Sequence, residues 1–298
     1  MPTHHNPTPA PPKRVVILGA NGFVARDLSS HLAEVGVPNV AVGSTQVDLL
    51  QADAVEKLRV IVGPDDALVI TSALTPEKGK DVRTFMKNLT MANQVCAFFE
   101  TGKCAHVIYL SSDAVYDESQ ALVSEATPRT GLGLYGLMHA AREQMLQFAA
   151  ATAKIPLCIV RPCAIYGAGD THNSYGPNRF FRTALRDRKI SLFGGGEEQR
   201  DHIYIRDVSR FIALCLARRT EGAVDIVTGR AVSFSDLSHI IINLCPHSVQ
   251  IENLARPVGA AITHRQFDIS PRLRAFPEFH TTPLADGLAE MARELLKE

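Results

Sequence analysis

A short glycine motif near the start of the chain has the residue types that hold a phosphate group. Two residues separate Gly19 from Gly22, and Ala25 follows at the third position after Gly22. Gly19 allows a tight turn, Gly22 lets the backbone approach a pyrophosphate, and Ala25 lets a helix pack closely on a strand. The free N–H groups of a helix N-terminus would then face the phosphates. The motif predicts a dinucleotide site, and a tight βα turn without a ligand is the alternative.

The residues around this motif predict the elements that such a site needs. Residues 15–18 are β-branched or aliphatic throughout and predict a buried parallel strand, and apolar residues at helical spacing follow the glycines. Similar strands are predicted at 39–43, 67–71, 106–110 and 157–161, with helices at 52–60, 80–101 and 134–153. This alternation predicts an α/β fold, a Rossmann-type doubly wound parallel sheet.

Small or hydroxyl-bearing residues stand where the predicted strands end. They are Gly19, Ser72, Ser111, Ser112 and Pro162. Because ligands of such sheets bind at the carboxyl ends of the strands, we expect these residues to line one crevice.

The remainder of the chain predicts three regions. Residues 1–13 hold five prolines without apolar periodicity and are expected to be a disordered tail. Residues 14–166 are the expected NAD(P)-binding Rossmann domain. Residues 167–298 begin with a Gly- and Asn-rich loop and continue in short elements, which predicts a smaller mixed α/β substrate-binding lobe. Segments at about 200–230 are the part of this lobe that could return to the Rossmann sheet.

Composition narrows the class of protein. The formal net charge is zero, with 46% hydrophobic and 21% charged residues, which argues against nucleic acid or a membrane surface as the main partner. No apolar run reaches about 18 residues, so no membrane span is expected. The six scattered cysteines form no C-x-x-C pair, so we expect reduced thiols, no metal site and a cytoplasmic location.

The end of the second predicted strand bears on the choice of cofactor. An acidic residue here usually binds the ribose 2′-hydroxyl of NAD, but this chain has Gly43, Ser44 and Thr45. The small hydroxyl residues suit a 2′-phosphate better than a carboxylate would, although no Arg or Lys stands beside them. We therefore expect NAD or NADP, with NADP slightly favoured.

Six blocks of the chain resemble one family and occur in that family's order. They are LGANGFVA, YLSSDAVYDE, LYGLMHAAREQML, VRPCAIYGAGD, GGGEEQRDHIYIRDV and the closing RQFDIS with DGLAEM. By these blocks the chain resembles the extended short-chain dehydrogenase/reductases, the NAD-dependent epimerase/dehydratase group that modifies sugar nucleotides. The resemblance runs from Arg14 almost to the C-terminus.

The resemblance implies a reacting centre of four residues. Tyr135 matches the family's catalytic tyrosine, which exchanges a proton with a sugar hydroxyl, and Ser112 matches the hydroxyl that shares this hydrogen bond. Asp113 resembles the acid near the substrate in the deoxysugar-nucleotide reductases. Ala114 stands where dehydratases carry glutamate, which counts against 4,6-dehydration.

His139 is the main departure from the family, which has lysine at this position. A lysine there lowers the pKa of the tyrosine and binds the nicotinamide ribose. Histidine, with an ordinary pKa of about 6.5, would be mostly neutral at pH 7 but could still donate one hydrogen bond to the ribose. Arg142 lies one helical turn further and is a possible substitute for the charge. A helix residue packed near the cofactor without a catalytic part is the alternative for His139.

The resemblance also implies binding residues outside this centre. The expected cofactor contacts are Gly19, Asn21, Gly22, Phe23, Val24, Ser44, Asp48, Leu49, Ala73, Leu74, Asn88, Ser111, Tyr135, His139 and Pro162. The expected contacts to the sugar nucleotide are Asn178, Arg200 and Arg256.

Together these features predict an NAD(P)-dependent redox enzyme on a nucleotide-linked sugar, an epimerase or a 4-keto-sugar reductase. The alternative is a catalytically impaired NAD(P)-binding protein that acts as a sensor or scaffold. The family often dimerises through the helix of the catalytic tyrosine and the long helix before it, so a homodimer is expected.

Overall fold

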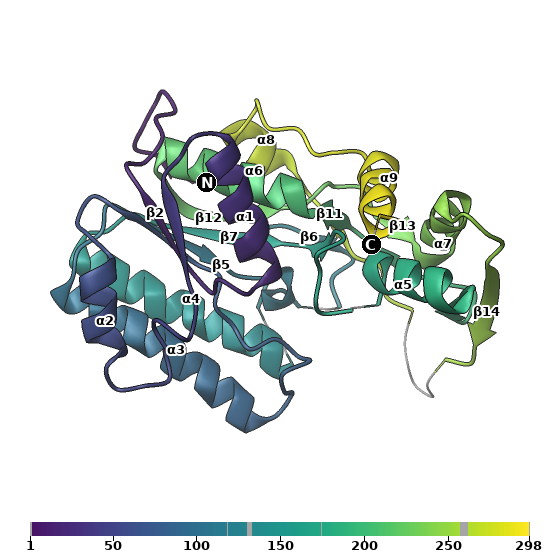
Figure 1. Cartoon of the computed structure of the whole chain (residues 1–298), viewed down its shortest axis with the longest axis horizontal. Coiled ribbons are helices and arrows are strands. Elements are labelled where there is room, and N and C mark those ends of the chain that lie inside the picture. Colours follow the sequence, from purple (N-terminus) through teal and green to yellow (C-terminus); the bar gives the residue numbers. More distant parts are fainter. Residues whose placement is uncertain (1, 118, 130–132, 174, 257–261, 298) are drawn as a thin grey trace.

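The computed structural model describes residues 2–117, 119–129, 133–173, 175–256 and 262–297. A sheet with helices on both faces forms one part of the molecule, and a smaller lobe extends beyond the ends of its strands (Figure 1).

The large sheet confirms the predicted Rossmann-type fold. Its order is β1-β12-β7-β5-β4-β2-β3. The strands are β1 (Thr3–His4), β2 (Val15–Leu18), β3 (Asn39–Val42), β4 (Ala67–Ile70), β5 (His106–Leu110), β7 (Leu157–Pro162) and β12 (Thr220–Ile226). All neighbours are parallel except β1 and β12. The chain passes from β2 to β3 on one side and returns to β4 on the other, which opens a crevice at the carboxyl ends of β2 and β4.

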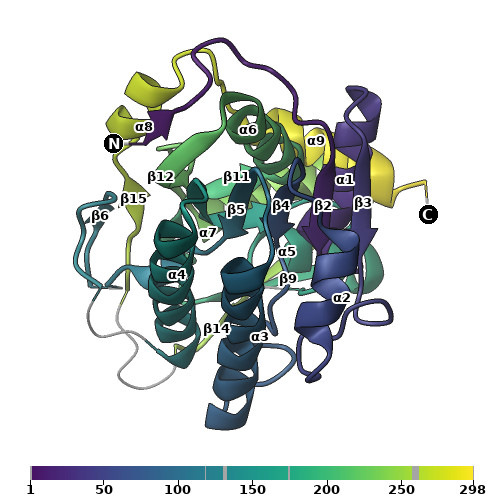
Figure 2. The ribbon, with the colours of Figure 1, turned by 90° about the vertical axis from the view of Figure 1, so that its left-hand side faces the viewer.

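Alternate residues of each central strand pack into two separate cores. Val15 and Ile17 contact the core under α1 (Phe23–Glu34) and α6 (Ile205–Arg218). Val16 and Leu18 point to the opposite core. The helices on that face are α2 (Ala54–Ile61), α3 (Val82–Thr101) and α4 (Leu134–Ala153), which Figure 2 shows below the sheet. Because both faces are covered, the strands are apolar throughout.

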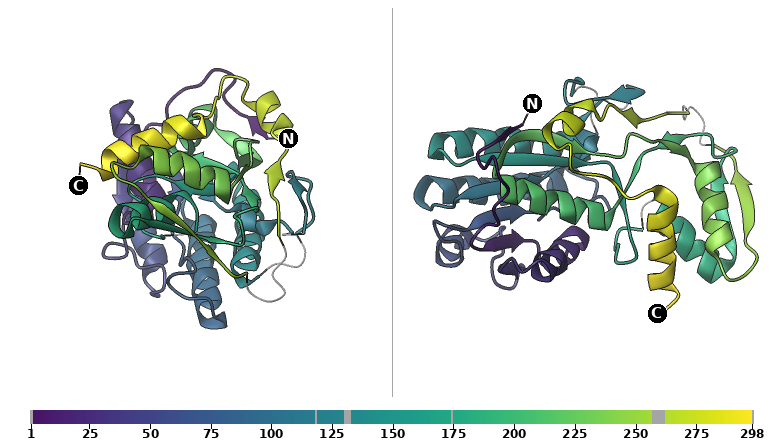
Figure 3. Two further views of the ribbon diagram at one scale, coloured as in Figure 1. Left: turned by 90° about the vertical axis from the view of Figure 1, so that its right-hand side faces the viewer. Right: turned by 90° about the horizontal axis from the view of Figure 1, so that it is seen from above.

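The smaller lobe combines helices with short strand pairs, as the right-hand view of Figure 3 shows from above. Its larger elements are α5 (Pro177–Asp187), β9 (Lys189–Phe193), α7 (Phe234–Leu244), β14 (Gln250–Leu254) and α9 (Leu284–Leu295). Short strands pair as β8 (Ala164–Tyr166) with β11 (His202–Tyr204), β10 (Gln199–Arg200) with β13 (Val232–Ser233), and β6 (Leu122–Val123) with β15 (Gln266–Phe267). The 3₁₀ helix η1 (Asp113–Val115) follows β5, and α8 (Ser270–Ala275) follows β15. The segment 220–226 returns from this half of the chain to the large sheet as β12.

The prediction of a disordered tail over residues 1–13, of which Met1 lies outside the described residues, is wrong where the chain forms β1. Thr3 and His4 form β1, which pairs antiparallel with the edge of β12. His4 Nδ1 lies 3.1 Å from Thr220 Oγ1, and its Nε2 lies 2.9 Å from the carbonyl oxygen of Ala275. The tail has no apolar pattern of its own, and its order comes from the open edge of a strand more than 200 residues away.

In the described part of the chain, none of the helices is both long and apolar enough to cross a membrane. Ser174, in the Gly- and Asn-rich loop predicted after residue 166, lies outside the described residues.

Candidate active site

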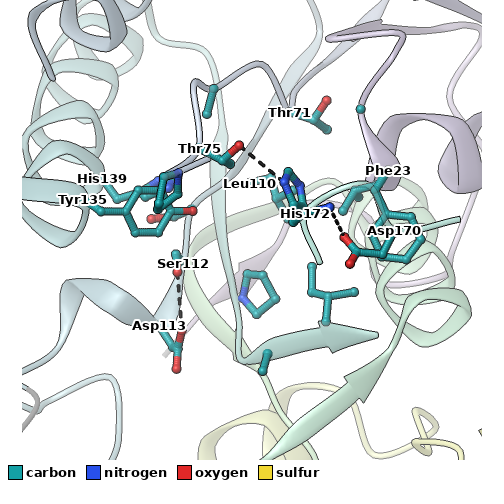
Figure 4. A pocket seen from close by; sticks show the side chains of 18 of the residues that line it. Phe23, Thr71, Thr75, Leu110, Ser112, Asp113, Tyr135, His139, Asp170 and His172 are labelled. Carbon is teal, nitrogen blue, oxygen red and sulfur yellow. Dashed lines mark hydrogen bonds between the residues drawn. The ribbon is translucent and has the colours of Figure 1, made fainter. Parts of the chain in front are cut away.

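A cavity of about 540 Å³ lies at the carboxyl ends of the central strands (Figure 4). Its wall is built from the β2–α1 turn, the segments after β4, β5 and β7, and the first turns of α4. The structure brings together ten of the predicted site residues here: Gly22, Phe23, Val24, Ala73, Ser111, Ser112, Asp113, Tyr135, His139 and Pro162.

The β2–α1 turn presents an open helix N-terminus to this cavity. Gly22 is the N-cap of α1, and no side chain caps the helix. Gly19 has φ +108°, and a Cβ there would lie 2.8 Å from Thr71 Oγ1 and 3.0 Å from the backbone nitrogen of Ser72. Close backbone packing and the positive φ therefore require glycine at position 19. The uncapped N–H groups at Phe23 and Val24 fit a dinucleotide pyrophosphate.

Tyr135 and Ser112 lie on the opposite side of the cavity (Figure 4). Tyr135 is in the first turn of α4, which begins after Gly133. Ser112 caps η1, and its hydroxyl accepts from the N–H of Ala114 at 3.1 Å. Burial raises the pKa of the Tyr135 phenol, and the neighbouring Tyr109 and Asp113 raise it further. The unliganded site therefore holds Tyr135 protonated.

His139 is a neutral member of this wall. Its Nδ1 lies 2.7 Å from the Tyr109 hydroxyl, and its ring packs edge-on against Tyr135 with centroids 4.8 Å apart. The side chain is 2% exposed, and burial with the nearby Arg142 lowers its pKa to about 3. Nε2 is buried and has no hydrogen-bond partner among the residues that the structure describes. This orphaned nitrogen fits a hydrogen bond to a bound ligand.

Asp113 is held by an arginine that sequence reasoning did not assign. Arg265 Nε lies 3.3 Å from Asp113 Oδ2, and Arg265 Nη2 donates to the backbone oxygen of Asp113. Burial raises the pKa of Asp113, and Arg265 opposes this change. Arg265 is the first residue of the closing RQFDIS block, but nothing in that block indicated that it would pair with Asp113.

A second set of residues that the sequence analysis did not assign lines the cavity from the loops after β4 and β8. His172 Nδ1 contacts Glu77 Oε1, and Thr75 Oγ1 lies 3.4 Å from the same ring nitrogen. The backbone N–H of His172 donates to Asp170 Oδ1 at 2.9 Å. Figure 4 shows His172 between Thr75 and Asp170. These loop residues have no diagnostic spacing in the sequence.

Two predicted contacts position the chain around the cavity. Asn88 Oδ1 accepts from the N–H of Leu74 at 2.8 Å, and its Nδ2 donates to the Leu74 carbonyl at 3.0 Å. Both residues line an adjoining cavity of about 300 Å³, which also reaches Tyr135. Asn178 Oδ1 accepts from the N–H of Gly167 at 3.1 Å. Asn178 therefore fixes the loop after β8.

The other predicted binding residues lie outside the lining of the large cavity. They are Gly19, Asn21, Ser44, Asp48, Leu49, Arg200 and Arg256. Asp48 accepts from the N–H of Leu50 at 3.0 Å. Arg200 donates to the Thr263 carbonyl at 2.7 Å, and Arg256 pairs with Glu197 and Glu198. Their contacts to ligand remain predictions.

Comparisons with known proteins identify the family of the chain. Residues 15–229 match the NAD dependent epimerase/dehydratase family. An uncharacterised UDP-glucose epimerase of Bacillus subtilis is 28% identical over 111 residues, which cover 37% of this chain and 35% of that protein. An ADP-L-glycero-D-manno-heptose-6-epimerase of Thiobacillus denitrificans is 24% identical over 257 residues, 77% of either chain.

The same architecture occurs in solved structures. A UDP-glucuronic acid 4-epimerase from Bacillus cereus, in complex with UDP-glucuronic acid and NAD, superposes with a TM-score of 0.81 at 21% identity. The match covers 95% of this chain and 99% of that chain. At this identity the likeness shows the fold alone.

Proposed function

The chain belongs to the NAD-dependent epimerase/dehydratase family, and on that premise we propose that it is an NAD(P)-dependent epimerase of a nucleotide-linked sugar. The proposal rests mainly on one observation. Tyr135, Ser112 and the unpartnered Nε2 of His139 share one cavity with the open N-terminus of α1. Nucleotide-sugar epimerases among the similar proteins support this choice. A 4-keto-sugar reductase would use the same residues.

Each residue has a role that follows from its position. The N-terminus of α1 and Gly22 would hold the pyrophosphate, and His139 Nε2 would meet a ribose hydroxyl. Tyr135 would exchange a proton with a sugar hydroxyl, and Ser112 Oγ would orient that hydroxyl. The bound nicotinamide would supply reversible hydride transfer. Its positive ring would also favour the ionised form of Tyr135, which the unliganded site disfavours.

The proposal is tested first by mass spectrometry of the small molecules that leave the purified protein on denaturation. Retained NAD or NADH supports an epimerase, which keeps its cofactor through the full cycle. An empty protein that binds NADPH better than NADH supports a reductase with a dissociable cofactor. Absence of both bound nucleotide and measurable affinity would exclude the dinucleotide site.

The catalytic assignment is tested with Tyr135→Phe. This variant keeps the ring that packs against His139 and removes the hydroxyl. It should retain cofactor affinity and lose at least about 100-fold in turnover, the usual contribution of a positioned acid or base. Unchanged turnover of a sugar nucleotide would refute the role of Tyr135.

A binding protein without turnover is the second candidate. The neutral state of His139 and the raised pKa of Tyr135 favour it, because none of the described residues places a cation directly beside the phenol as the family's lysine does. Cofactor binding without any oxidation or reduction, across a panel of sugar nucleotides, would support this alternative.

For the cofactor, we keep a slight preference for NADP. Ser44 is exposed at the end of β3, and residues 43–47 contain no acid that would repel a 2′-phosphate. They also contain no base, so the expected preference is small. The ratio of the dissociation constants of NADPH and NADH measures it directly.

We also propose a homodimer that pairs the outer faces of α3 and α4. Phe148 on α4 is 78% exposed and lines a depression of about 310 Å³ with Cys96 and Phe99 of α3. An exposed aromatic beside an apolar hollow is typical of an interface. All six cysteines are free thiols, which supports a reducing, cytoplasmic location.

A further inference from the structure

A buried arginine beneath the cavity has no part in the proposed proton exchange. Arg142 lies on α4 one turn beyond His139 and is fully buried. Its Nη2 donates to the Ser72 carbonyl after β4 at 2.8 Å, and its Nη1 lies 3.5 Å from Asn88 Oδ1 on α3. In the described part of the chain, no carboxylate pairs with this guanidinium. It is therefore a fixed positive charge.

Tyr109 connects this charge to His139. The guanidinium carbon of Arg142 lies 5.1 Å from the centroid of the Tyr109 ring on β5. The Tyr109 hydroxyl lies 2.7 Å from His139 Nδ1. A cation over the ring makes the phenol a stronger hydrogen-bond donor, because positive charge stabilises the electrons left by a departing proton. Tyr109 nevertheless stays protonated, since burial raises its pKa to about 12.

We propose that Arg142 and Tyr109 fix His139 in the tautomer that carries its proton on Nε2, so that a neutral ring donates a hydrogen bond into the cavity. In this arrangement the Tyr109 hydroxyl, 2.7 Å from Nδ1, acts as the donor, and a neutral imidazole has only one N–H. That N–H is then on Nε2, which is buried without a partner in a residue of the cavity wall.

Arg142 and Tyr109 are positioning residues in this arrangement. The identification of a ribose hydroxyl as the acceptor rests on the proposed function. The assignment of the tautomer does not depend on that function. This hydrogen bond would replace one of the contacts that the family's lysine makes. The positive charge would lie on Arg142, one helical turn further along α4.

The groups around the ring also keep it uncharged. Among the described residues, the titratable or charged neighbours that face His139 are Tyr109 from β5, and Tyr135 and Arg142 from α4. None of the three supplies a negative charge at neutral pH, since both phenols are protonated. An imidazolium would therefore be repelled by Arg142 without compensation.

The tautomer can be read directly by NMR. Full-length protein labelled with ¹⁵N-histidine is measured without cofactor at pH 7, and His139→Gln identifies the His139 signals by their loss. We expect a protonated Nε2 and an unprotonated Nδ1. A protonated Nδ1, or a doubly protonated ring, would overturn the proposal.

Two variants separate the donor from the charge. Tyr109→Phe keeps the ring beside Arg142 and removes the donor, so both tautomers of His139 should appear. Arg142→Met keeps the length of the side chain and removes the charge, so His139 should take up a proton at a pH at least one unit higher than in the unaltered protein.

A matched control distinguishes positioning from general stability. Arg272 on α8 is also buried, lies 5.5 Å from the Phe279 ring centroid and donates to a carbonyl at 3.1 Å. Arg272→Met should lower thermal stability without moving the His139 signals. If Arg142→Met also leaves the His139 signals unchanged, Arg142 has no positioning role.

Cofactor titration then links the tautomer to binding. Tyr109→Phe and Arg142→Met should weaken the affinity for NADH and NADPH by about 3- to 10-fold, the effect of one neutral hydrogen bond. Equal affinity in both variants would refute the contact to the cofactor. If the unaltered protein binds neither nucleotide but shows the expected tautomer, the proposed function fails and the tautomer assignment stands.

Discussion

Replacing His139 by lysine, the residue that the family carries there, should destabilise this protein. His139 and Arg142 are three residues apart on α4, and both side chains are buried. Helix side chains at this spacing lie about 6 Å apart. Two positive charges at that distance repel by about 3 kcal/mol at an effective dielectric constant of about 20. The repulsion equals about two pKa units, which would lower the pKa of the new lysine from about 10.4 to about 8.4, so the lysine would still be charged at pH 7 and neutral at pH 10.

The coupling is measured with four proteins: the unaltered chain, His139→Lys, Arg142→Met and the double variant. Urea unfolding at pH 7 gives the free energy of unfolding of each by linear extrapolation. We expect His139→Lys to lose about 3 kcal/mol. The double variant should be more stable than the sum of the two single effects by at least about 2 kcal/mol.

A second pH provides the control for this cycle. At pH 10 a lysine with a lowered pKa is neutral in the folded protein, so the coupling energy should shrink. Additive effects within about 0.5 kcal/mol at pH 7 would refute the reasoning, because they would mean that Arg142 does not sense a charge at position 139.

Three further measurements test other parts of the structure. Gly19→Ala should lower the free energy of unfolding by about 3 kcal/mol or more, because its Cβ meets backbone at 3.0 Å in addition to the strain of a positive φ. Gly36→Ala is the control, since Gly36 has φ +73° and open space around it. If both variants lower the free energy of unfolding by the same small amount, the close packing around Gly19 is contradicted. Between pH 7 and 5 the unaltered protein should lose about 2 kcal/mol of unfolding free energy relative to His139→Gln. Only the unfolded chain, with a histidine pKa of about 6.5 against about 3 when folded, takes up the proton as the pH falls, and a parallel pH dependence of the two proteins would argue against a neutral His139. Phe148→Glu should convert the proposed dimer to a monomer in sedimentation, whereas Val60→Glu on α2, which is 87% exposed, should not; a dimer that persists in Phe148→Glu would place the interface elsewhere.

The sequence alone determined the fold and the main elements of the site. The apolar strands, the glycine turn and the long helix that carries Tyr135 are local patterns, because strand alternation, helical spacing and turn chemistry depend on neighbouring residues. Since parallel strands all present their carboxyl ends at one edge of the sheet, these patterns also brought Gly22, Ser112 and Tyr135 to one cavity. Small errors remained at boundaries, such as the start of α2 at Ala54 rather than at residue 52.

The tertiary structure alone decided which residues meet across long stretches of chain. Arg265 reaches Asp113 over 152 positions, and β1 finds its partner in β12. Arg142, Tyr109 and His139 form a unit because α4 packs on the face of β5, and the helical spacing of Arg142 gave no sign of the ring it covers. Such contacts depend on packing angles and on which side chain fills which space, and these properties belong to the assembled core rather than to any local segment.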